Sequence, residues 1–455
     1  MTEITTLLIA NRGEIARRIL RTTRRMSIRT VVVYAEIDRD APCVQEADVA
    51  VPLISATGTE PYLDQSQLLT IARQVGADAI HPGYGFLSER ASFAEACEEA
   101  GFLWIGPPAH VLQQMSHKLA AKEVARTAGI PTLPDAVVST DRESGWEQAA
   151  SQLGYPLLVK TNAGGGGKEI RLVATPSDLF KAIREVSHVA SHSLSETIMF
   201  LEGALSSPRH IEVQIVADMH GSVLHLYERD CSIQRRYQKV AEAAPPLGLS
   251  SRLLQQMRDA SLTLATLLGY VGVGTVEYLV EGDRFFFLEM NPRLQMEHPI
   301  TECLTSLDLV QLQLQIACGG PLPMQQHEIP CAGSALEARL YAEDPLAGFR
   351  RTFGRLEQFD LSPHPGIRYE TGVASGQMIS RYGLLAKVIA HAPTRSEAAH
   401  RLAHALREIQ VKGLRTNRDF LLAILTHPDF LAGSPPTDFV HTHPELLNQQ
   451  EQEPE

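Results

Sequence analysis

The stretch EMNPRLQMEH, positions 289 to 298, brings together residue types that bind cations and anions. If its backbone is extended, successive side chains point to opposite faces. One face then carries the polar residues Glu289, Asn291, Arg293, Gln295 and Glu297, and the apolar residues between them take the other. The first two can ligate a divalent cation, and the last three can hold a small anion and offer it a base. Pro292 predicts an edge strand or an end to regular pairing.

A second carboxylate is expected to lie opposite Glu289. The runs GTVEYLV and RFFFLEMN are typical of a hairpin, and with a turn at Gly282 to Arg284, Glu281 pairs with Phe285. Counting along both strands then places Glu277 opposite Glu289. Like charges facing each other destabilise a ladder, and a divalent cation such as Mg²⁺ reverses that cost. A solvated hairpin face or a shifted register remains the alternative.

Four glycines, 164 to 167, lie between Lys160 and Lys168. Backbone amides without side chains can close on phosphate oxygens, and the two lysines add charge. The run is not a Walker A loop, because Glu169 stands where Ser or Thr is required, and the strand-like IRLV that follows excludes a dinucleotide fingerprint. We predict a mobile hairpin that covers phosphates, with a plain flexible linker as the alternative.

A basic run, ERDCSIQRRYQK, occupies positions 228 to 239 of an otherwise acidic chain. It follows a strand-like run and is predicted to contribute to an anion site, although a lone basic run is more often solvent-exposed. Its basic residues are Arg229, Arg235, Arg236 and Lys239.

The elements that must position these residues fall into successive regions. From Thr5 to about Pro108, short apolar runs alternate with amphipathic helical stretches, which predicts a parallel, doubly wound, Rossmann-like sheet. After a helix around His117 to Ala128, YPLLVKTNAGGGGKEIRLV predicts two strands joined by the glycine-rich turn, and a helix follows near Ser177 to Ala190. Later strands include HIEVQIVAD and SVLHLYERD. A last helix is predicted from the capping box Thr394 to Glu397 up to Gly413.

Composition limits the possible functions. The 455 residues include 41 Lys+Arg and 53 Asp+Glu, a net charge of −12 that disfavours nucleic-acid or anionic-membrane binding. No stretch approaches a membrane span and no signal peptide is recognisable, so we expect a cytoplasmic protein. The six scattered cysteines lack a CxxC pair and are expected to be reduced thiols.

Six motifs in order resemble the biotin carboxylase family of ATP-grasp enzymes: NRGEIARRI, HPGYGFLSE, GGGGK, ERDCSIQRR, EMNPRLQMEH and LEARLYAEDP. The resemblance covers roughly Thr5 to Phe430. It implies an α/β and α+β fold with a Rossmann-like N-terminal (pre-ATP-grasp) domain at 1–115 and an ATP-grasp lid subdomain with the glycine-rich loop at 132–204. A catalytic and C-terminal biotin carboxylase region would occupy 205–447, and a frayed tail 448–455.

The resemblance also implies the reaction: ATP phosphorylates bicarbonate, and the carboxyphosphate so formed carboxylates N1 of biotin. The residues implied to contact ATP are Lys118, Lys160, Gly164, Gly165, Gly166, Gly167, Glu202, Leu205, His210 and Gln234. Those implied to hold Mg²⁺ or Mn²⁺ are Glu277, Glu289 and Asn291. Those implied to hold bicarbonate are Lys239, Arg293, Gln295, the Met296 backbone and Glu297. In this resemblance Glu297 is the catalytic base, and Arg339 stabilises the biotin enolate beside Tyr84 and Gly85.

The chain departs from the family pattern at four places. The glycine loop continues as Lys168, Glu169 and Ile170 rather than Arg or Lys followed by Gly and Met. Gly203 replaces a lysine beside the adenine-contacting glutamate, Tyr237 replaces a histidine, and Gly383 replaces an aspartate in the YDSMIGK motif. Two alternatives therefore stay open: an ATP-grasp ligase with a non-biotin acceptor, and a degenerate nucleotide-binding regulatory subunit.

The sequence contains no Met-Lys pair, so the biotin-accepting lysine motif is absent and the biotinylated carrier is expected to be another chain. The resemblance implies carboxyltransferase partner subunits, as in acetyl-CoA carboxylase of fatty acid synthesis, and a homodimer. The acyl-CoA that is finally carboxylated is left open.

Overall fold

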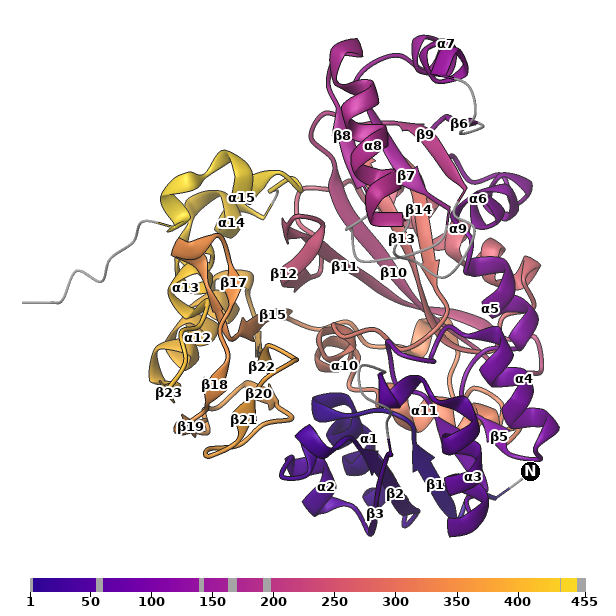
Figure 1. The fold of residues 1–455 in the computed structure, drawn as a ribbon, viewed down its shortest axis with the longest axis vertical. Helices are drawn as coiled ribbons and strands as arrows, with labels where there is room; N and C mark the ends of the chain where they lie inside the picture. Colours follow the sequence, from indigo (N-terminus) through magenta and orange to yellow (C-terminus); the bar gives the residue numbers. More distant parts are fainter. Residues whose placement is uncertain are drawn as a thin grey trace, which may run out of the picture.

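The computed structural model describes residues 3–54, 60–138, 143–162, 170–190, 198–433 and 435–447. Three large sheets organise these residues: a five-stranded, a four-stranded and an eight-stranded sheet. Figure 1 shows the five-stranded sheet at one end of the molecule, the four-stranded sheet at the other, and the C-terminal elements along one side. The glycine run and the tail from residue 448 lie outside the described residues.

The five-stranded sheet is parallel, in the order β3-β2-β1-β4-β5, which confirms the predicted Rossmann-like plan. Its strands are β1 (Thr6–Ile9), β2 (Arg29–Tyr34), β3 (Val49–Pro52), β4 (Ala79–His81) and β5 (Leu103–Trp104). Its helices are α1 (Gly13–Arg25), α2 (Pro42–Glu46), α3 (Gln65–Val75), α4 (Ala91–Glu99) and α5 (Ala109–Met115). All four of its strand pairings are parallel, as expected for strands separated by helices.

The four-stranded sheet lies in the region that the resemblance assigns to the lid, and its strands have the order β6-β9-β7-β8. Strands β7 and β8 are antiparallel and flank the glycine run, as predicted. The elements are α6 (Lys118–Thr127), β6 (Asp135–Val137), α7 (Glu143–Leu153), β7 (Leu157–Thr161), β8 (Ile170–Val173), α8 (Leu179–Ala190) and β9 (Met199–Gly203). Helices α7 and α8 pack on this sheet around a separate core that includes Trp146 and Val186.

The eight-stranded sheet carries the predicted metal ligands and four more of the predicted site residues, and its strands have the order β14-β13-β10-β11-β12-β15-β22-β20. Its strands are β10 (Arg209–Ala217), β11 (Val223–Arg235), β12 (Gln238–Ala244), β13 (Gly272–Glu281), β14 (Arg284–Asn291), β15 (Ser334–Tyr341), β20 (Ile367–Glu370) and β22 (Leu384–Ala392). Helices α9 (Ser251–Leu267), α10 (His298–Thr305) and α11 (Leu309–Ala317) connect and cover them.

The C-terminal part differs from the prediction. Helix α12 (Arg395–Glu408) begins at the predicted cap, where Thr394 accepts a hydrogen bond from the Glu397 amide, but it ends before Gly413 because Gln410 to Lys412 form a strand. It is also not the last helix. The remaining elements are β16 (Glu343–Asp344), β17 (Arg350–Arg351), β18 (Gly354–Arg355), β19 (Gln358–Asp360), β21 (Met378–Ile379), β23 (Gln410–Lys412), α13 (Arg418–Thr426), α14 (Pro428–Ala432) and α15 (Phe439–Thr442).

In the hairpin β13–β14 Glu277 faces Glu289 as predicted, but the residues paired at the turn differ from the prediction. Glu281 pairs with Arg284, so the predicted Glu281–Phe285 pairing is wrong. A β-bulge between Phe287 and Glu289 adds one residue to β14 and restores Glu277 opposite Glu289. Without that extra residue the turn would have set a different register.

The predicted extended run through position 297 is wrong beyond Asn291. Strand β14 is the edge of its sheet and ends there, before Pro292, as that proline predicted. The chain then turns, and Glu297 precedes helix α10 as its N-cap residue. The polar residues after Asn291 reach the site through a loop instead of by alternation along a strand.

The N-terminal and central regions share one apolar core. It joins Ile15 and Ile19 of α1 to Leu312 of α11 and Val273 of β13. Charges reinforce this contact, because Arg18 of α1 donates to Glu302 at 2.5 Å and to Asp308 at 2.8 Å. The N-terminal region is therefore packed rigidly against the elements of the site.

Candidate active site

Two carboxylates and an amide lie together at the end of the β13–β14 hairpin. Glu277 and Glu289 are paired residues, and the Asn291 side-chain nitrogen donates to Glu277 at 2.8 Å and to Glu289 at 3.3 Å. The amide nitrogen thus occupies the place between two carboxylates that a cation would take. Two carboxylates and an amide oxygen are hard ligands, so the donor set fits Mg²⁺ or Mn²⁺.

The two carboxyl groups differ in their electrostatic surroundings. Burial alone would raise the pKa of Glu277, but Lys239 and His210 more than offset burial and hold its pKa well below the usual value. Burial and the charge of Glu277 raise the pKa of Glu289. A cation between them would relieve this repulsion.

Lys239 connects Glu277, of the carboxylate pair assigned to the metal, with Glu297, which is assigned to bicarbonate. Its ammonium group donates to Glu212 at 2.6 Å, Glu277 at 2.9 Å and Glu297 at 2.6 Å. Burial would lower the pKa of Lys239, but these three carboxylates raise it well above the ordinary value, so the group stays charged. Of the predicted basic run, Lys239 is the member that reaches the carboxylates of the site.

Arg293 and Gln295 extend the cluster from the loop before α10. Arg293 donates to the Asn291 side-chain oxygen at 2.9 Å and to Glu89 at 2.5 Å. Gln295 donates to Glu277 at 2.6 Å. The loop therefore places a guanidinium and an amide beside the carboxylate pair.

Glu297 lies between two cations, because Arg339 donates to its second oxygen at 3.1 Å. Burial would raise the pKa of Glu297, but Lys239, Arg339 and Arg229 lower it far below the usual value. The carboxylate is therefore ionised and able to accept a proton. Arg339 also contacts Glu242, whose pKa burial raises to about 7.

Two residues assigned to ATP by the resemblance adjoin the carboxylate pair. His210 lies with Nε2 2.8 Å from Glu277, and the Gln234 amide nitrogen is 2.8 Å from His210 Nδ1. Both side chains are almost fully buried. They tie strands β10 and β11 to the carboxylate of β13.

The lid contributes a second charged cluster, around Glu202 of β9. Lys160 of β7 contacts Glu202, and Lys122 of α6 donates to it at 2.7 Å. Lys118, at the start of α6, donates to the Thr161 carbonyl at 3.1 Å. Burial would raise the pKa of Glu202, but Lys160 and Lys122 lower it. Leu205 is partly exposed in the loop that follows β9.

The residues assigned to biotin lie where the N-terminal and C-terminal regions meet. The Tyr84 carbonyl accepts from Asn11 at 2.8 Å, and Gly85 adopts a φ of 67°. The Lys387 ammonium lies 5.9 Å from the centre of the Tyr84 ring and donates to the Met296 carbonyl at 2.7 Å. Lys387 thereby connects Met296, assigned to bicarbonate, with the tyrosine assigned to biotin.

Sequence reasoning missed two residues that hold the site in shape, Glu212 and Glu89, and gave Arg229 a different role. Arg229 is fully buried and binds Glu212, Gln214, Thr301 and Gln295, so it is a scaffold rather than the anion ligand predicted from its basic run. Glu212 anchors both Arg229 and Lys239. Glu89, in the loop after β4, holds Arg293. Its place in HPGYGFLSE was visible in the sequence, but its partner was not.

The departures from the family pattern have different surroundings. A Cβ added at Gly203 would lie 3.2 Å from Pro134 Cγ, so the glycine suits this close approach. At Gly383 a Cβ would meet nothing closer than 3.6 Å, so the backbone does not require glycine there. Tyr237 lies in the β11–β12 turn with a φ of 63° and a half-exposed side chain. The four glycines, Lys168 and Glu169 lie outside the described residues.

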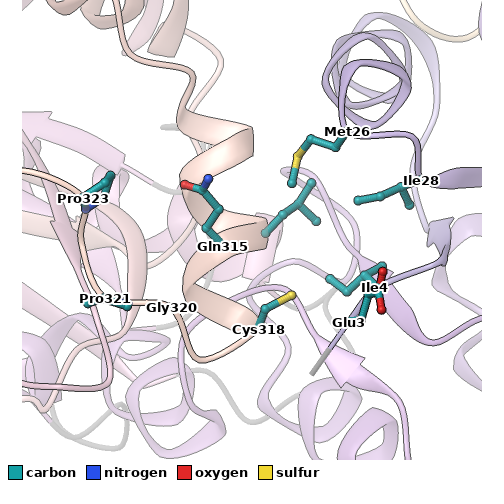
Figure 2. Close-up of a pocket in the computed structure, with 10 residues that line it drawn as sticks. Glu3, Ile4, Met26, Ile28, Gln315, Cys318, Gly320, Pro321 and Pro323 are labelled. Atoms are coloured by element: carbon teal, nitrogen blue, oxygen red, sulfur yellow. The ribbon is translucent and has the colours of Figure 1, made fainter. Parts of the chain in front are cut away.

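A cavity of about 460 Å³ lies away from this site, between the N-terminal sheet and α11 (Figure 2). Ile4, Met26 and Ile28 line one side, and Leu314 and Cys318 line the other. None of the residues of the charged cluster lines it.

Within the described residues, no helix combines the length and apolar character that crossing a membrane requires. All six cysteines are free.

Three family models match successive parts of the chain. They are "Biotin carboxylase, N-terminal domain" at residues 3–112, "Carbamoyl-phosphate synthase L chain, ATP binding domain" at 117–325 and "Biotin carboxylase C-terminal domain" at 337–442. Together they account for most of the sequence.

Curated relatives agree with these models. The biotin carboxylase of Halalkalibacterium halodurans is 45% identical over 440 residues, which are 96% of this chain and 97% of that protein. The mitochondrial methylcrotonoyl-CoA carboxylase subunit alpha of Dictyostelium discoideum is 42% identical over 98% of this chain, but the match spans only 64% of that longer protein.

Solved structures agree as well. The biotin carboxylase domain dimer of Hydrogenobacter thermophilus 2-oxoglutarate carboxylase, in complex with MgADP, ADP and bicarbonate, has a TM-score of 0.96 at 36% identity, covering 99% of this chain and 100% of that one. The biotin carboxylase of Campylobacter jejuni in complex with β,γ-ATP has a TM-score of 0.93 at 35% identity, covering 97% and 99%. The chain belongs to the biotin carboxylase family of ATP-grasp ligases, which carboxylate biotin with bicarbonate and MgATP.

Proposed function

We propose that the cluster around Glu277, Lys239 and Glu297 is the centre at which this protein phosphorylates bicarbonate. The observation that supports this most is the single ammonium of Lys239, which bonds to a carboxylate of the metal-type pair and to the carboxylate proposed as base. Phosphoryl transfer to bicarbonate requires the metal, the anion and the base within a few ångströms of one another.

Glu277, Glu289 and the Asn291 oxygen would hold Mg²⁺ or Mn²⁺, which neutralises charge on the ATP phosphates. Lys118, Lys160, Glu202, Leu205, His210 and Gln234 would bind the nucleotide. The glycine run would cover its phosphates, although that run lies outside the described residues.

Lys239, Arg293, Gln295 and the Met296 backbone would orient bicarbonate beside Glu297. The Glu297 carboxylate then takes the bicarbonate proton while the bicarbonate oxygen forms a bond to the γ-phosphorus and ADP leaves. A bound anion draws on the charge of Lys239 and adds negative charge beside Glu297, so it raises the low pKa of Glu297 and strengthens it as a base. Carboxyphosphate would then carboxylate N1 of biotin.

Arg339 would stabilise the biotin enolate oxygen beside Tyr84 and Gly85. Its guanidinium already bonds to Glu297, so the base and the enolate-stabilising group share one contact. Lys387 adds a positive charge on the Tyr84 side. This would place the biotin ring at the junction of the N-terminal and C-terminal regions.

We also propose that the protein is the biotin carboxylase component of an acyl-CoA carboxylase and acts with a biotinylated carrier and a carboxyltransferase. Curated relatives named methylcrotonoyl-CoA and propionyl-CoA carboxylase subunits are longer, and this chain spans 64% and 67% of two of them. Acetyl-CoA remains another acyl-CoA to test. The Hydrogenobacter domain was solved as a dimer, which supports a homodimer here. The free cysteines are compatible with a location in the cytoplasm.

The first test is phosphate release from MgATP by the purified protein, without bicarbonate, with bicarbonate, and with free biotin added. Stimulation by both is expected. Stimulation by bicarbonate alone would support another acceptor, and no stimulation at all would support a regulatory subunit. Adding candidate biotinylated carriers and acyl-CoA carboxyltransferases would then assign the partner.

Substitution of the proposed base is the sharper test. Glu297→Gln removes the proton acceptor but keeps the shape, so bicarbonate-dependent phosphate release should fall about 10²- to 10⁴-fold while ATP still binds. The exposed Glu98→Gln serves as the matched control and should retain full activity. Retained turnover in Glu297→Gln would remove Glu297 from the role of base.

A further inference from the structure

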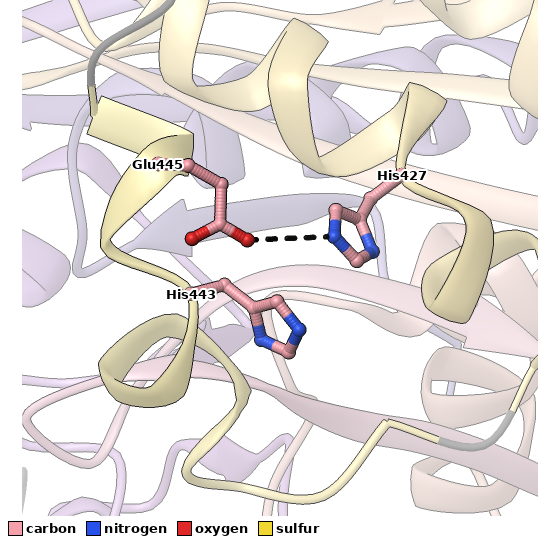
Figure 3. Close-up of side chains that lie close together, drawn as sticks. All are labelled: His427, His443 and Glu445. Atoms are coloured by element: carbon pink, nitrogen blue, oxygen red, sulfur yellow. Dashed lines mark ion pairs between the residues drawn. The ribbon is translucent and has the colours of Figure 1, made fainter.

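A second cluster of metal-ligating side chains lies far along the chain from the carboxylation site, near the C-terminus. His427, His443 and Glu445 each present a ligand atom, and these atoms all lie within 4.8 Å of one another (Figure 3). His427 Nε2 is 3.8 Å from a Glu445 oxygen, and Asp429 places an oxygen 3.4 Å from His443 Nε2.

His443 is fixed in the tautomer that a metal requires. Its Nδ1 lies 2.9 Å from the Phe439 carbonyl oxygen, which can only accept, so Nδ1 carries the proton. The lone pair of neutral His443 is then on Nε2, the atom that faces Asp429. A backbone carbonyl that holds the other ring nitrogen is the usual support of a metal-bound histidine.

The hydrogen bond to His427 favours the opposite ring tautomer. Its Nδ1 accepts from the Asp429 amide at 3.2 Å, so in the neutral ring Nε2 carries the proton and faces Glu445. To ligate a cation through Nε2 the ring must move that proton to Nδ1 and give up one long hydrogen bond. The free energy of binding a cation to two imidazoles and a carboxylate offsets the loss of that hydrogen bond.

The rings are held in place by packing. Phe439 is fully buried, with its ring centre 5.1 Å from that of His427 and 4.5 Å from that of His443. The histidine side chains are 18% and 23% exposed, whereas Glu445 is 59% exposed. Packing thus holds both rings over an apolar floor, with His443 already in the ligating tautomer, and the carboxylate approaches from solvent.

We propose that His427, His443 and Glu445 form a binding site for a divalent transition metal of the Zn²⁺ type, with Asp429 or water as the fourth ligand. Two imidazoles and a carboxylate favour Zn²⁺ over Mg²⁺, whereas the carboxylate pair Glu277 and Glu289 favours the reverse. The inference concerns metal binding and stability, and it does not depend on the carboxylation activity.

The site would connect two parts of the C-terminal segment that also share an apolar core. His427 lies at the junction of α13 and α14, whereas His443 and Glu445 follow α15. Helix α15 packs against β11, which carries Arg229 and Gln234. A metal here would fix the C-terminal segment on the body of the protein next to that strand.

Zn²⁺ binding to the full chain tests the proposal. The metal-stripped protein is titrated with Zn²⁺ against a chromogenic chelator, with Mg²⁺ in excess to fill the carboxylate pair, and its melting temperature is recorded in parallel. The wild type should bind Zn²⁺ and melt at a higher temperature with it. His443→Gln and Glu445→Gln should each weaken binding at least about tenfold and lose the thermal shift, while bicarbonate-dependent phosphate release stays unchanged.

The matched control is His404→Gln. His404 packs edge to face against His364, with ring centres 5.1 Å apart, and this second histidine pair is not among the metal-ligand clusters of the described residues. Its loss should leave Zn²⁺ binding as in the wild type. Co²⁺ in the wild-type protein should give the intense visible absorption of a four-coordinate site, which does not require any variant to fold. Equal Zn²⁺ binding in all variants, or no such Co²⁺ spectrum, would overturn the proposal and leave only histidine–carboxylate ion pairs.

Discussion

At the scale of single residues, the most unusual feature beside the site is a pair of buried carboxyl groups, Glu242 and Glu337. They face each other across β12 and β15, both are fully buried, and Glu242 forms an ion pair with Arg339. Burial raises the pKa of Glu242 to about 7 although Arg339 lowers it, and burial raises that of Glu337 well above the ordinary value. Arg339 is thus held between Glu297, which is ionised, and Glu242, which titrates near neutrality.

The raised pKa of Glu242 predicts a pH-dependent loss of stability. A carboxyl whose pKa is higher in the folded than in the unfolded protein stabilises the fold at low pH, and that stability is lost as pH rises through about 7. Glu242→Gln removes this contribution, up to roughly 3 kcal/mol for a shift of this size. We expect the melting temperature of Glu242→Gln to fall less between pH 5.5 and pH 8 than that of the wild type.

The groups that face Glu242 are Glu337, Arg339, Glu297 and Lys239, and all four remain in the Glu242→Gln variant, so the difference reports on Glu242 itself. Glu98→Gln, on an exposed face of α4, should melt with the pH dependence of the wild type. Parallel pH curves for wild type and Glu242→Gln would show that Glu242 is already ionised at pH 5.5.

At the scale of elements, the β-bulge in β14 decides which side chains reach the site. By simple alternation Phe285, Phe287, Glu289 and Asn291 would share one face. The structure instead packs Phe287 and Met290 into the core, with Phe285 partly buried against it, while Glu289 and Asn291 bond to each other. The extra residue exchanges the two faces of the strand between Phe287 and Glu289, so the aromatic residues pack while the carboxylate faces its partner.

Strand β11 contributes the scaffold residue Arg229, which predicts a large effect for a conservative change. Its guanidinium bonds side chains on β10 and α10 and in the loop that carries Gln295. Arg229→Lys keeps the charge but cannot reach all of these acceptors, so buried partners lose their bonds. We expect a loss of about 3 to 5 kcal/mol in the free energy of unfolding and a raised KM for bicarbonate.

Arg284→Lys is the comparison, because Arg284 is exposed at the hairpin turn and pairs with Glu281 at 3.4 Å. Its melting temperature and bicarbonate KM should match those of the wild type. If Arg229→Lys behaves like Arg284→Lys, the network around Arg229 is not what holds Gln295 in place.

At the scale of the whole molecule, the site is assembled from regions that are far apart in the sequence. Glu89 follows β4 of the N-terminal sheet, and Arg293 follows β14 of the central sheet. Glu14 of α1 lies 3.2 Å from Lys387 of β22. The apolar core shared by α1 and α11 packs the N-terminal and central regions against each other.

The Glu89–Arg293 contact predicts a modest and specific effect. Glu89 is 43% exposed, so solvent screens the pair, and Glu89→Gln should raise the KM for bicarbonate roughly two- to fivefold with little change in kcat or melting temperature. Steady-state phosphate release measures this. Glu46→Gln removes another carboxylate that pairs with an arginine, Arg17, wholly within the N-terminal region, and should leave KM unchanged. A KM in Glu89→Gln equal to that of the wild type would show that Asn291 and the Leu294 carbonyl are enough to orient Arg293.

The sequence by itself determined the order of the elements and the types of residue in the site. Alternation of apolar runs and helices predicted the parallel sheet. Counting along a hairpin also predicted that Glu277 faces Glu289, although the assumed turn was wrong and the bulge compensated for it. These are local properties, because the periodicity of a strand or helix is set by its own backbone. The prediction weakened where the backbone became irregular, at the bulge in β14, at the loop after Asn291 and at the early end of α12.

Only the tertiary structure decided which charged residues bind each other. The basic run alone did not distinguish Arg229, which is buried in the scaffold, from Lys239, which only the family resemblance assigned to the site. Nothing in the sequence paired Glu89 with Arg293 across 204 positions. The shifts in the pKa values of Glu297 and Glu242 likewise depend on burial and on partners supplied by other strands. Such contacts are set by how the sheets pack, and packing is a property of the whole chain rather than of any segment.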